Sequence, residues 1–128
     1  MAGVVSVIGV DPAGALAELT EISPELEAAV LLDESGSVVA STLADDLRSS
    51  QIARAAVELL STADEIRPRL GEATVTHLQA ALAEGSVFLV RAAKRVLAAA
   101  TAADPTVGLV LYDMKSCLRA LDEDDVPS

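Results

Sequence analysis

The sequence predicts an α/β fold of the α+β type, a five-stranded antiparallel sheet flanked by helices in the order α-β-β-α-β-β-β-α. Three observations lead to this prediction. Asp-Pro pairs at 11–12 and 104–105 each precede a run with helical periodicity, a long segment between them lacks glycine and proline, and five short apolar runs are separated by turns. Strands joined by tight turns pair antiparallel, because parallel neighbours need crossovers of a dozen residues or more. Such elements stack as a sandwich of two or three layers.

The first helix is predicted over about Pro12–Ile22. Asp11 suits the N-cap, proline suits the first helical position, and Leu16, Leu19 and Ile22 follow at near-helical spacing. A hairpin comes next, because two apolar runs, 28–33 and 37–41, enclose the turn residues Glu34-Ser35-Gly36.

A long helix is predicted over about Ala44–Arg67, where glycine and proline are absent. Apolar residues form one heptad-like stripe of Ile52, Ala56, Leu59, Ala63, Ile66 and Leu70, and a second stripe of Ala53, Val57 and Leu60. Together these stripes are wider than a helix lying on one sheet requires. We therefore expect the extra apolar face to have a partner.

The last third predicts three strands and a helix. The strands span about Ala73–Leu82, Ser86–Ala92 and Arg95–Thr101, and the helix spans about Pro105–Leu121. The predicted domain is therefore residues 11–121, with an N-terminal segment at 1–10 and an acidic tail at 122–128.

Composition narrows the function classes. The chain has 128 residues, of which 52% are hydrophobic and 2% aromatic, so one compact domain with an aliphatic core is expected. A formal net charge of −11 disfavours nucleic acid as a partner, because phosphate backbones repel it. No window approaches the roughly 20 apolar residues of a membrane span, and no basic residue precedes the apolar stretch at 4–10, so neither membrane insertion nor a secretory signal is predicted. The expected location is the cytoplasm.

The negative charge is concentrated in the first third of the chain, because residues 1–47 hold nine acids and no base. Asp33 and Glu34 at the hairpin tip, with Asp45 and Asp46 before the long helix, are candidates for an acidic contact surface. The alternatives are that these acids serve turn geometry and solubility.

No cofactor, metal or catalytic site is predicted. His77 is the single histidine and has no partner in the sequence for acid–base chemistry, whereas Cys117 lies on an apolar helical stripe where a thiol acts as a small hydrophobe. No glycine-rich loop followed by lysine suits a phosphate, and no Cys/His or Asp/Glu spacing suits zinc or calcium.

Four stretches together resemble a known family. They are Leu19-Thr20-Glu21-Ile22, the hairpin at 29–40, the Glu84-Gly85-Ser86-Val87-Phe88-Leu89-Val90 hairpin, and Pro105-Thr106-Val107-Gly108-Leu109. In order and spacing they resemble the Roadblock/dynein light-chain domain, which is related to longin and profilin-like folds, over about Asp11–Leu121. The short acidic chain is most similar to the free-standing bacterial members.

This resemblance implies a homodimer in which the long helices pack side by side and the sheets join edge to edge. The implied interface residues are Ile52, Ala56, Leu59, Ala63, Val75 and His77. It also implies a small Ras-like GTPase as partner, which the dimer activates, regulates or tethers. The family supplies no catalytic side chain, and no arginine of this chain is distinguished as an arginine finger. We therefore expect a protein that is not an enzyme.

Two other functions stay open at this point. One is a small-molecule sensor or adaptor of a signalling complex, which requires an internal pocket. The other is a small hydrolase, which requires a serine or cysteine nucleophile close to His77.

Overall fold

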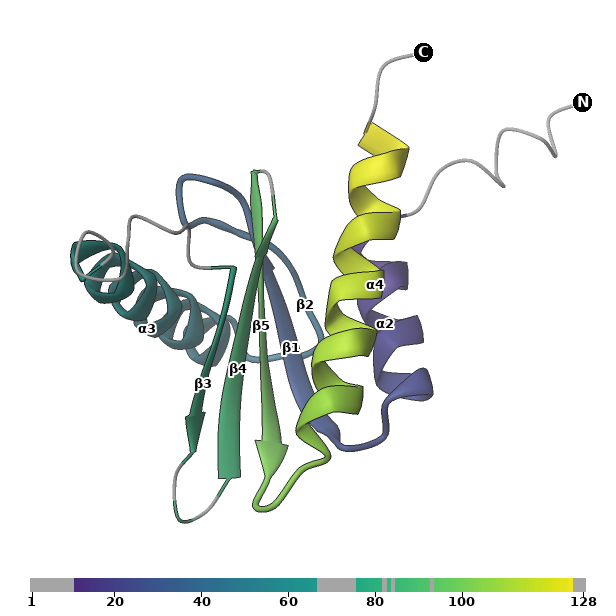
Figure 1. Cartoon of the computed structure of the whole chain (residues 1–128). Helices are drawn as coiled ribbons and strands as arrows, with labels where there is room; N and C mark the ends of the chain where they lie inside the picture. Colours follow the sequence, from purple (N-terminus) through teal and green to yellow (C-terminus); the bar gives the residue numbers. More distant parts are fainter. Residues whose placement is uncertain (1–10, 67–75, 82, 84, 93, 126–128) are drawn as a thin grey trace, which may run out of the picture.

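The computed structural model describes residues 11–66, 76–81, 83, 85–92 and 94–125. These residues form three layers, with a sheet between helix α3 on one face and helices α2 and α4 on the other (Figure 1). The elements are α2 (Pro12–Ile22), β1 (Leu26–Leu32), β2 (Val38–Ser41), α3 (Asp46–Glu65), β3 (His77–Ala81), β4 (Gly85–Ala92), β5 (Arg95–Ala102) and α4 (Val107–Asp125). The predicted fold class and element order are confirmed.

The five strands form one antiparallel sheet in the order β2-β1-β5-β4-β3. The last strand, β5, lies in the centre, where Ala29 pairs with Ala99 of β5 and Phe88 of β4 pairs with the same residue. The short strand β2 and the strand β3 form the two edges. The β1–β2 hairpin and the β3–β4–β5 meander therefore meet where β1 pairs with β5.

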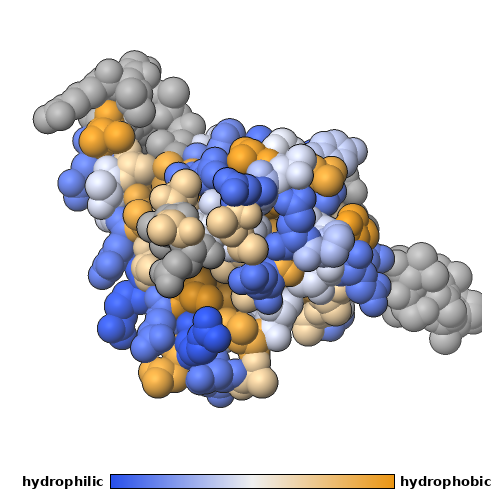
Figure 2. All heavy atoms as spheres, turned by 90° about the horizontal axis from the view of Figure 1, so that it is seen from below, coloured by the Kyte–Doolittle hydropathy of each residue, from blue (hydrophilic) through white to orange (hydrophobic). Residues whose placement is uncertain are grey.

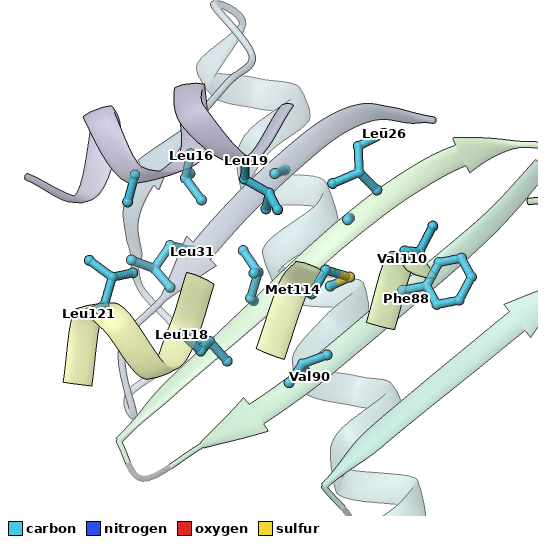
Figure 3. Close-up of a cluster of buried hydrophobic side chains, with 14 residues drawn as sticks. Leu16, Leu19, Leu26, Leu31, Phe88, Val90, Val110, Met114, Leu118 and Leu121 are labelled. Carbon is cyan, nitrogen blue, oxygen red and sulfur yellow. The ribbon is translucent and has the colours of Figure 1, made fainter. Parts of the chain in front are cut away.

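The core between the sheet and α2 and α4 is the larger of two. Leu16 and Leu19 of α2 point toward Met114 and Leu118 of α4, above Leu31 of β1 (Figure 3). These side chains are at most 3% exposed, so each contributes roughly 1.5–3 kcal/mol of burial free energy. This layer fixes both helices against one face of the sheet.

The ends of α2 follow the predicted sequence signals. The carboxylate of Asp11 accepts a hydrogen bond from the backbone N–H of Gly14 at 3.0 Å, and Pro12 occupies the first turn. The backbone N–H of Ser23 closes the other end by donating to the carbonyl of Leu19 at 2.8 Å.

The ends of α4 differ from the prediction. Asp104 has φ 59°, a left-handed conformation unlike the extended backbone of an N-cap, so the Asp104-Pro105 pair does not begin the helix. The first helical hydrogen bond instead joins the N–H of Val110 to the carbonyl of Thr106 at 3.0 Å. The carboxylate of Glu25, from the connection between α2 and β1, accepts the N–H of Thr106.

At its other end α4 continues to Asp125, so the predicted acidic tail begins as helix. Between the predicted end at Leu121 and Pro127 there is no glycine or proline to end the helix earlier. Among the described residues no helix is both long and apolar enough to cross a lipid bilayer.

Candidate interaction surface

Helix α3 buries one row of mostly small side chains and leaves a second row of larger apolar side chains partly exposed. Its inward row is Ser49, Ala53, Ala56, Leu60 and Ala63, which packs on the sheet. Leu59 and Ile66 remain 40% and 43% exposed, and Ile52 is half-buried. These three residues are seven positions apart, which is the spacing of a helix–helix seam. The excess of apolar surface predicted for this helix is therefore confirmed in a single chain.

A groove runs between this exposed row and the sheet. Its volume is about 290 Å³, and every lining side chain is alanine, valine, leucine or isoleucine. Ile52, Ala55 and Leu59 form the helical wall, whereas Ala80 of β3 and Val87 of β4 belong to the floor. Helix α3 lies on one face of the sheet (Figure 1), where among the described elements it mainly contacts β1, β2 and the central strand β5.

Strand β3 borders the groove with an unpaired backbone edge. The N–H of Arg91 donates to the carbonyl of Thr76 at 2.8 Å, and the register places Leu78 opposite Leu89 two residues further on. Hydrogen-bonded pairs alternate in antiparallel sheets, so the backbone groups of His77, Gln79 and Ala81 point away from β4. Within the described part of the chain, β3 has no neighbouring strand on that side. Such an edge is a template for strand pairing.

Apart from His77, the residues expected at a dimer interface fall into three groups, which line the groove, are buried elsewhere, or lie outside the described residues. Ile52, Ala56 and Leu59 line the groove, and Ala56 is 1% exposed because it also packs on the chain's own sheet. Ala63 is 6% exposed and does not line the groove. In a single chain both alanines are buried, so their place in a dimer interface stays a prediction. Val75 lies outside the described residues.

His77 is exposed and belongs to the edge strand, but its side chain is on the α4 face. It pairs with Val90, whose side chain belongs to the core beneath α2 and α4. Directly opposite residues of an antiparallel pair share a face. The side chain of His77 therefore points away from the groove, and His77 contributes only its backbone groups to the open strand edge beside it.

The opposite flank of α3 is held in place by contacts with the hairpins. Arg91 of β4 donates two hydrogen bonds to the carboxylate of Asp64, Nη1 to Oδ2 at 3.0 Å and Nη2 to Oδ1 at 2.8 Å. This pair raises the pKa of Arg91, so the guanidinium stays charged. Val57 packs beside Gly36, where a Cβ would come within 2.9 Å of its Cγ2. Arg91 therefore joins β4 to the end of α3 through its two hydrogen bonds to Asp64.

Asp33 organises the β1–β2 turn. Its Oδ1 accepts hydrogen bonds from the Ser35 hydroxyl at 2.6 Å and from the backbone N–H groups of Ser35 and Ser37 at 2.9 and 3.0 Å. The Ser35 hydroxyl, followed by the Ser37 N–H, lowers the pKa of Asp33 below its ordinary value. Asp33 is a candidate either for an acidic contact surface or for turn geometry, and all of these contacts serve turn geometry.

Asp45 caps the N-terminus of α3, because its carboxylate accepts the N–H groups of Leu47 and Arg48 at 2.9 and 3.3 Å. Asp46 follows in the first turn, where a negative charge favours the helix dipole. The four residues of strand β2 separate these two acids from Asp33 and Glu34, a span of roughly 13 Å at 3.3 Å per residue. The structure therefore places the four predicted acids as two separate pairs.

Cys117 and His77, the residues whose side chains could act as nucleophile or base, lie apart from each other in environments that do not favour catalysis. Cys117 packs on α2 with its Sγ 3.9 Å from the carbonyl of Ala15, and burial, followed by the charge of Glu18, raises the pKa of its thiol. In the described residues the side chain of His77 makes no hydrogen bond, and no group of three or more histidine, cysteine or acidic side chains is arranged to hold a metal ion. Within the described part of the chain, neither Cys117 nor His77 therefore has the side-chain partner that nucleophilic or acid–base chemistry requires.

Comparison with protein families gives one decisive match. The model of the Roadblock/LC7 domain matches residues 13–102. The chain belongs to the Roadblock/LC7 family. Comparison with curated proteins finds no match.

Solved structures of this family share the fold. A Roadblock/LC7 domain from Streptomyces avermitilis superposes with a TM-score of 0.82 at 20% identity, over 89% of this chain and 97% of that one. Myxococcus xanthus MglB gives a TM-score of 0.75 at 16% identity, over 87% and 91% of the two chains. Acanthamoeba castellanii profilin IA gives 0.58 at 14% identity, over 89% and 98%. The Roadblock/LC7 domain described here is thus related in fold to profilin, as its sequence predicted.

Proposed function

We propose that this Roadblock/LC7 domain is a cytoplasmic homodimer that regulates or scaffolds a small Ras-like GTPase without catalysing a reaction itself. The observation that carries the proposal is the apolar row of Ile52, Leu59 and Ile66 beside the open edge of β3. A second copy related by a two-fold axis presents the same row and the same edge, so one contact covers both.

The geometry favours simultaneous pairing of helices and strands. Antiparallel pairing of two β3 edges satisfies the outward backbone groups of His77, Gln79 and Ala81 and continues the sheet. It also brings the α3 helix of each copy toward the groove of the other. Burying a side chain such as Leu59 is worth roughly 1.5–3 kcal/mol, which favours association.

Membership of the Roadblock/LC7 family favours a regulatory role. The sequence resemblance to free-standing bacterial members implies a GTPase partner, whose own nucleotide site then supplies the chemistry. Two of the four predicted acids, Glu34 and Asp46, have exposed side chains without a structural hydrogen bond in the described chain. We include these two in the proposed partner surface.

The partner is tested with a small GTPase encoded beside this chain, loaded with either GDP or a non-hydrolysable GTP analogue. We expect the chain to bind one state more tightly, because a regulator shifts an equilibrium only through such a difference. We also expect the hydrolysis rate to change. A variant made monomeric by Leu59→Glu should lose both effects. Equal failure to bind both states, with unchanged hydrolysis, would contradict the GTPase assignment.

A small-molecule sensor is the second candidate, and the groove beside α3 favours it. At about 290 Å³ this groove is near the lower limit for ligand pockets, and it is entirely apolar. A sensor predicts a monomer whose melting temperature rises with an apolar ligand. The dimer proposal predicts instead that the groove is closed to such ligands by the second copy.

A further inference from the structure

A second groove lies on the opposite face of the molecule, between α2 and α4. These helices lie side by side over the sheet, on the side away from α3 (Figure 1). The groove has a volume of about 380 Å³. Ala15 and Leu19 of α2 and Cys117 of α4 supply its buried or half-buried lining. Because it is on the other face, pairing of α3 with a second copy does not cover it.

Two large side chains stand exposed at one end of this groove. Ile22, the last residue of α2, is 62% exposed, and Tyr112 of α4 is 66% exposed. Hydrophobic side chains reach the surface in several separate places among hydrophilic ones (Figure 2), but a tyrosine and an isoleucine beside a formed groove are a stronger feature. Tyrosine is enriched among the residues that dominate binding energy at protein interfaces.

The charges around this groove have one sign. Its charged lining residues are Glu18 and Asp113, and helix α2 carries no basic residue. The basic residues Lys115 and Arg119 of α4 line a different depression, on the side of β4. Helix α4 therefore directs its basic flank away from the groove and an acidic flank toward it.

We propose that the α2–α4 groove binds a basic amphipathic helix of a partner protein. The apolar floor with Ile22 and Tyr112 accepts the apolar side chains of such a helix, and Glu18 and Asp113 face its lysines or arginines. The 11 residues of α2 extend about 16 Å, which matches three turns of a docked helix with anchors at i, i+3, i+4 and i+7. This proposal does not rest on the GTPase assignment.

The test uses the full chain and a synthetic amphipathic peptide with leucine on one face and lysine on the other, measured by fluorescence anisotropy. We expect saturable binding of one peptide per chain that weakens with added salt. Tyr112→Ser should weaken binding about tenfold or more, because it removes an interface anchor. The control Leu47→Ser changes an equally exposed residue on α3 and should leave binding unchanged.

Charge variants separate this groove from general attraction to an acidic protein. Glu18→Gln should weaken binding, whereas Glu58→Gln, on α3, should not, although both remove one negative charge. A peptide of the same composition with its leucines scattered should bind weakly to every variant. Unchanged melting temperatures will show that the variants are folded.

Three results would overturn the proposal. One is peptide binding that Tyr112→Ser and Leu47→Ser reduce equally, because the peptide then has no preferred face. Another is equal binding of the amphipathic and the scattered peptide. The third is binding that appears only after residues 1–10 are removed, because the groove is then occupied by the chain's own apolar segment.

Discussion

Gly85, the first residue of β4, lies directly against the backbone of β5. A Cβ at this position would overlap the carbonyl oxygen of Thr101, and this oxygen belongs to the backbone of a central strand. We predict that Gly85→Ala lowers the free energy of unfolding by about 1–3 kcal/mol, because one strand must shift. Chemical denaturation measures this change. Gly108→Ala is the control, since its added Cβ meets nothing within 4 Å outside the adjoining backbone of its own helix. A loss of similar size in both variants would contradict the prediction.

Asp33 makes the stability of the hairpin depend on pH. Its pKa is lowered in the folded chain by the Ser35 hydroxyl and the Ser37 N–H, so its contribution is present above the ordinary aspartate pKa of about 3.9. The contribution is lost as the pH falls through the lowered folded value. We therefore predict that Asp33→Asn lowers the melting temperature at about pH 7 and that the difference from the unmodified chain shrinks toward about pH 2.5.

The matched control for this residue is Glu34→Gln. Glu34 is the next residue in the same turn, but in the described chain its carboxylate accepts none of the turn's hydrogen bonds. Its variant should melt close to the unmodified chain at both pH values. An Asp33→Asn difference that stays constant across this range would show that the carboxylate charge does not stabilise the turn.

At the scale of elements, the pair of Asp64 and Arg91 joins the end of α3 to β4. Their side chains are 41% and 24% exposed, so solvent screens the charges, although the two hydrogen bonds orient them. We predict a coupling free energy of up to about 1 kcal/mol in a double-mutant cycle of Asp64→Ala and Arg91→Met. Arg54 and Glu58 on the same helix form no ion pair in the described structure and should show no coupling. Equal coupling for both pairs would contradict this role.

The helices and strands were predictable from local sequence signals, but the pairing of strands that are distant in sequence was not. The hairpin at β1–β2 and the periodicity of α3 depend on residues close in sequence, so both were predicted within two residues of their observed ends wherever those ends are described. The pairing of β1 with β5 joins Leu31 to Leu97, which no local pattern encodes. Helix α4 starts at Val107, two residues after the predicted Pro105, but the cap predicted at Asp104 was wrong. The N–H of Thr106 is instead bound by Glu25, which comes from a distant part of the chain.

The sequence predicted that α3 has an apolar surface in need of a partner, but it did not settle which residues form that surface. A surplus of apolar residues on α3 indicated a partner, but periodicity alone did not separate Ala56, which faces the sheet, from Leu59, which faces outward. That choice depends on the angle at which the helix lies on the strands. Small side chains such as Ala80 and Ala98 in the floor of the groove gave a weak signal, because alanine is common throughout the sequence.

For the whole molecule, the two faces are expected to have separate tasks. The α3 face, with its apolar row and open strand edge, suits a second copy of the chain, and the α2–α4 face suits another protein. We predict that a charge at position 59 separates the copies without unfolding them, because Leu59 is 40% exposed in the single chain. Circular dichroism of Leu59→Glu should therefore match that of the unmodified chain.

Sedimentation at micromolar concentration tests the central claim most directly. Self-association through α3 and β3 predicts a particle of twice the 13.1 kDa chain mass, which Leu59→Glu reduces to a monomer. Leu47→Glu should remain a dimer, because Leu47 lies about 140° around the helix from Ile52 at 100° per residue. A stable 13.1 kDa monomer of the unmodified chain, or a dimer that Leu59→Glu leaves intact, would contradict the account.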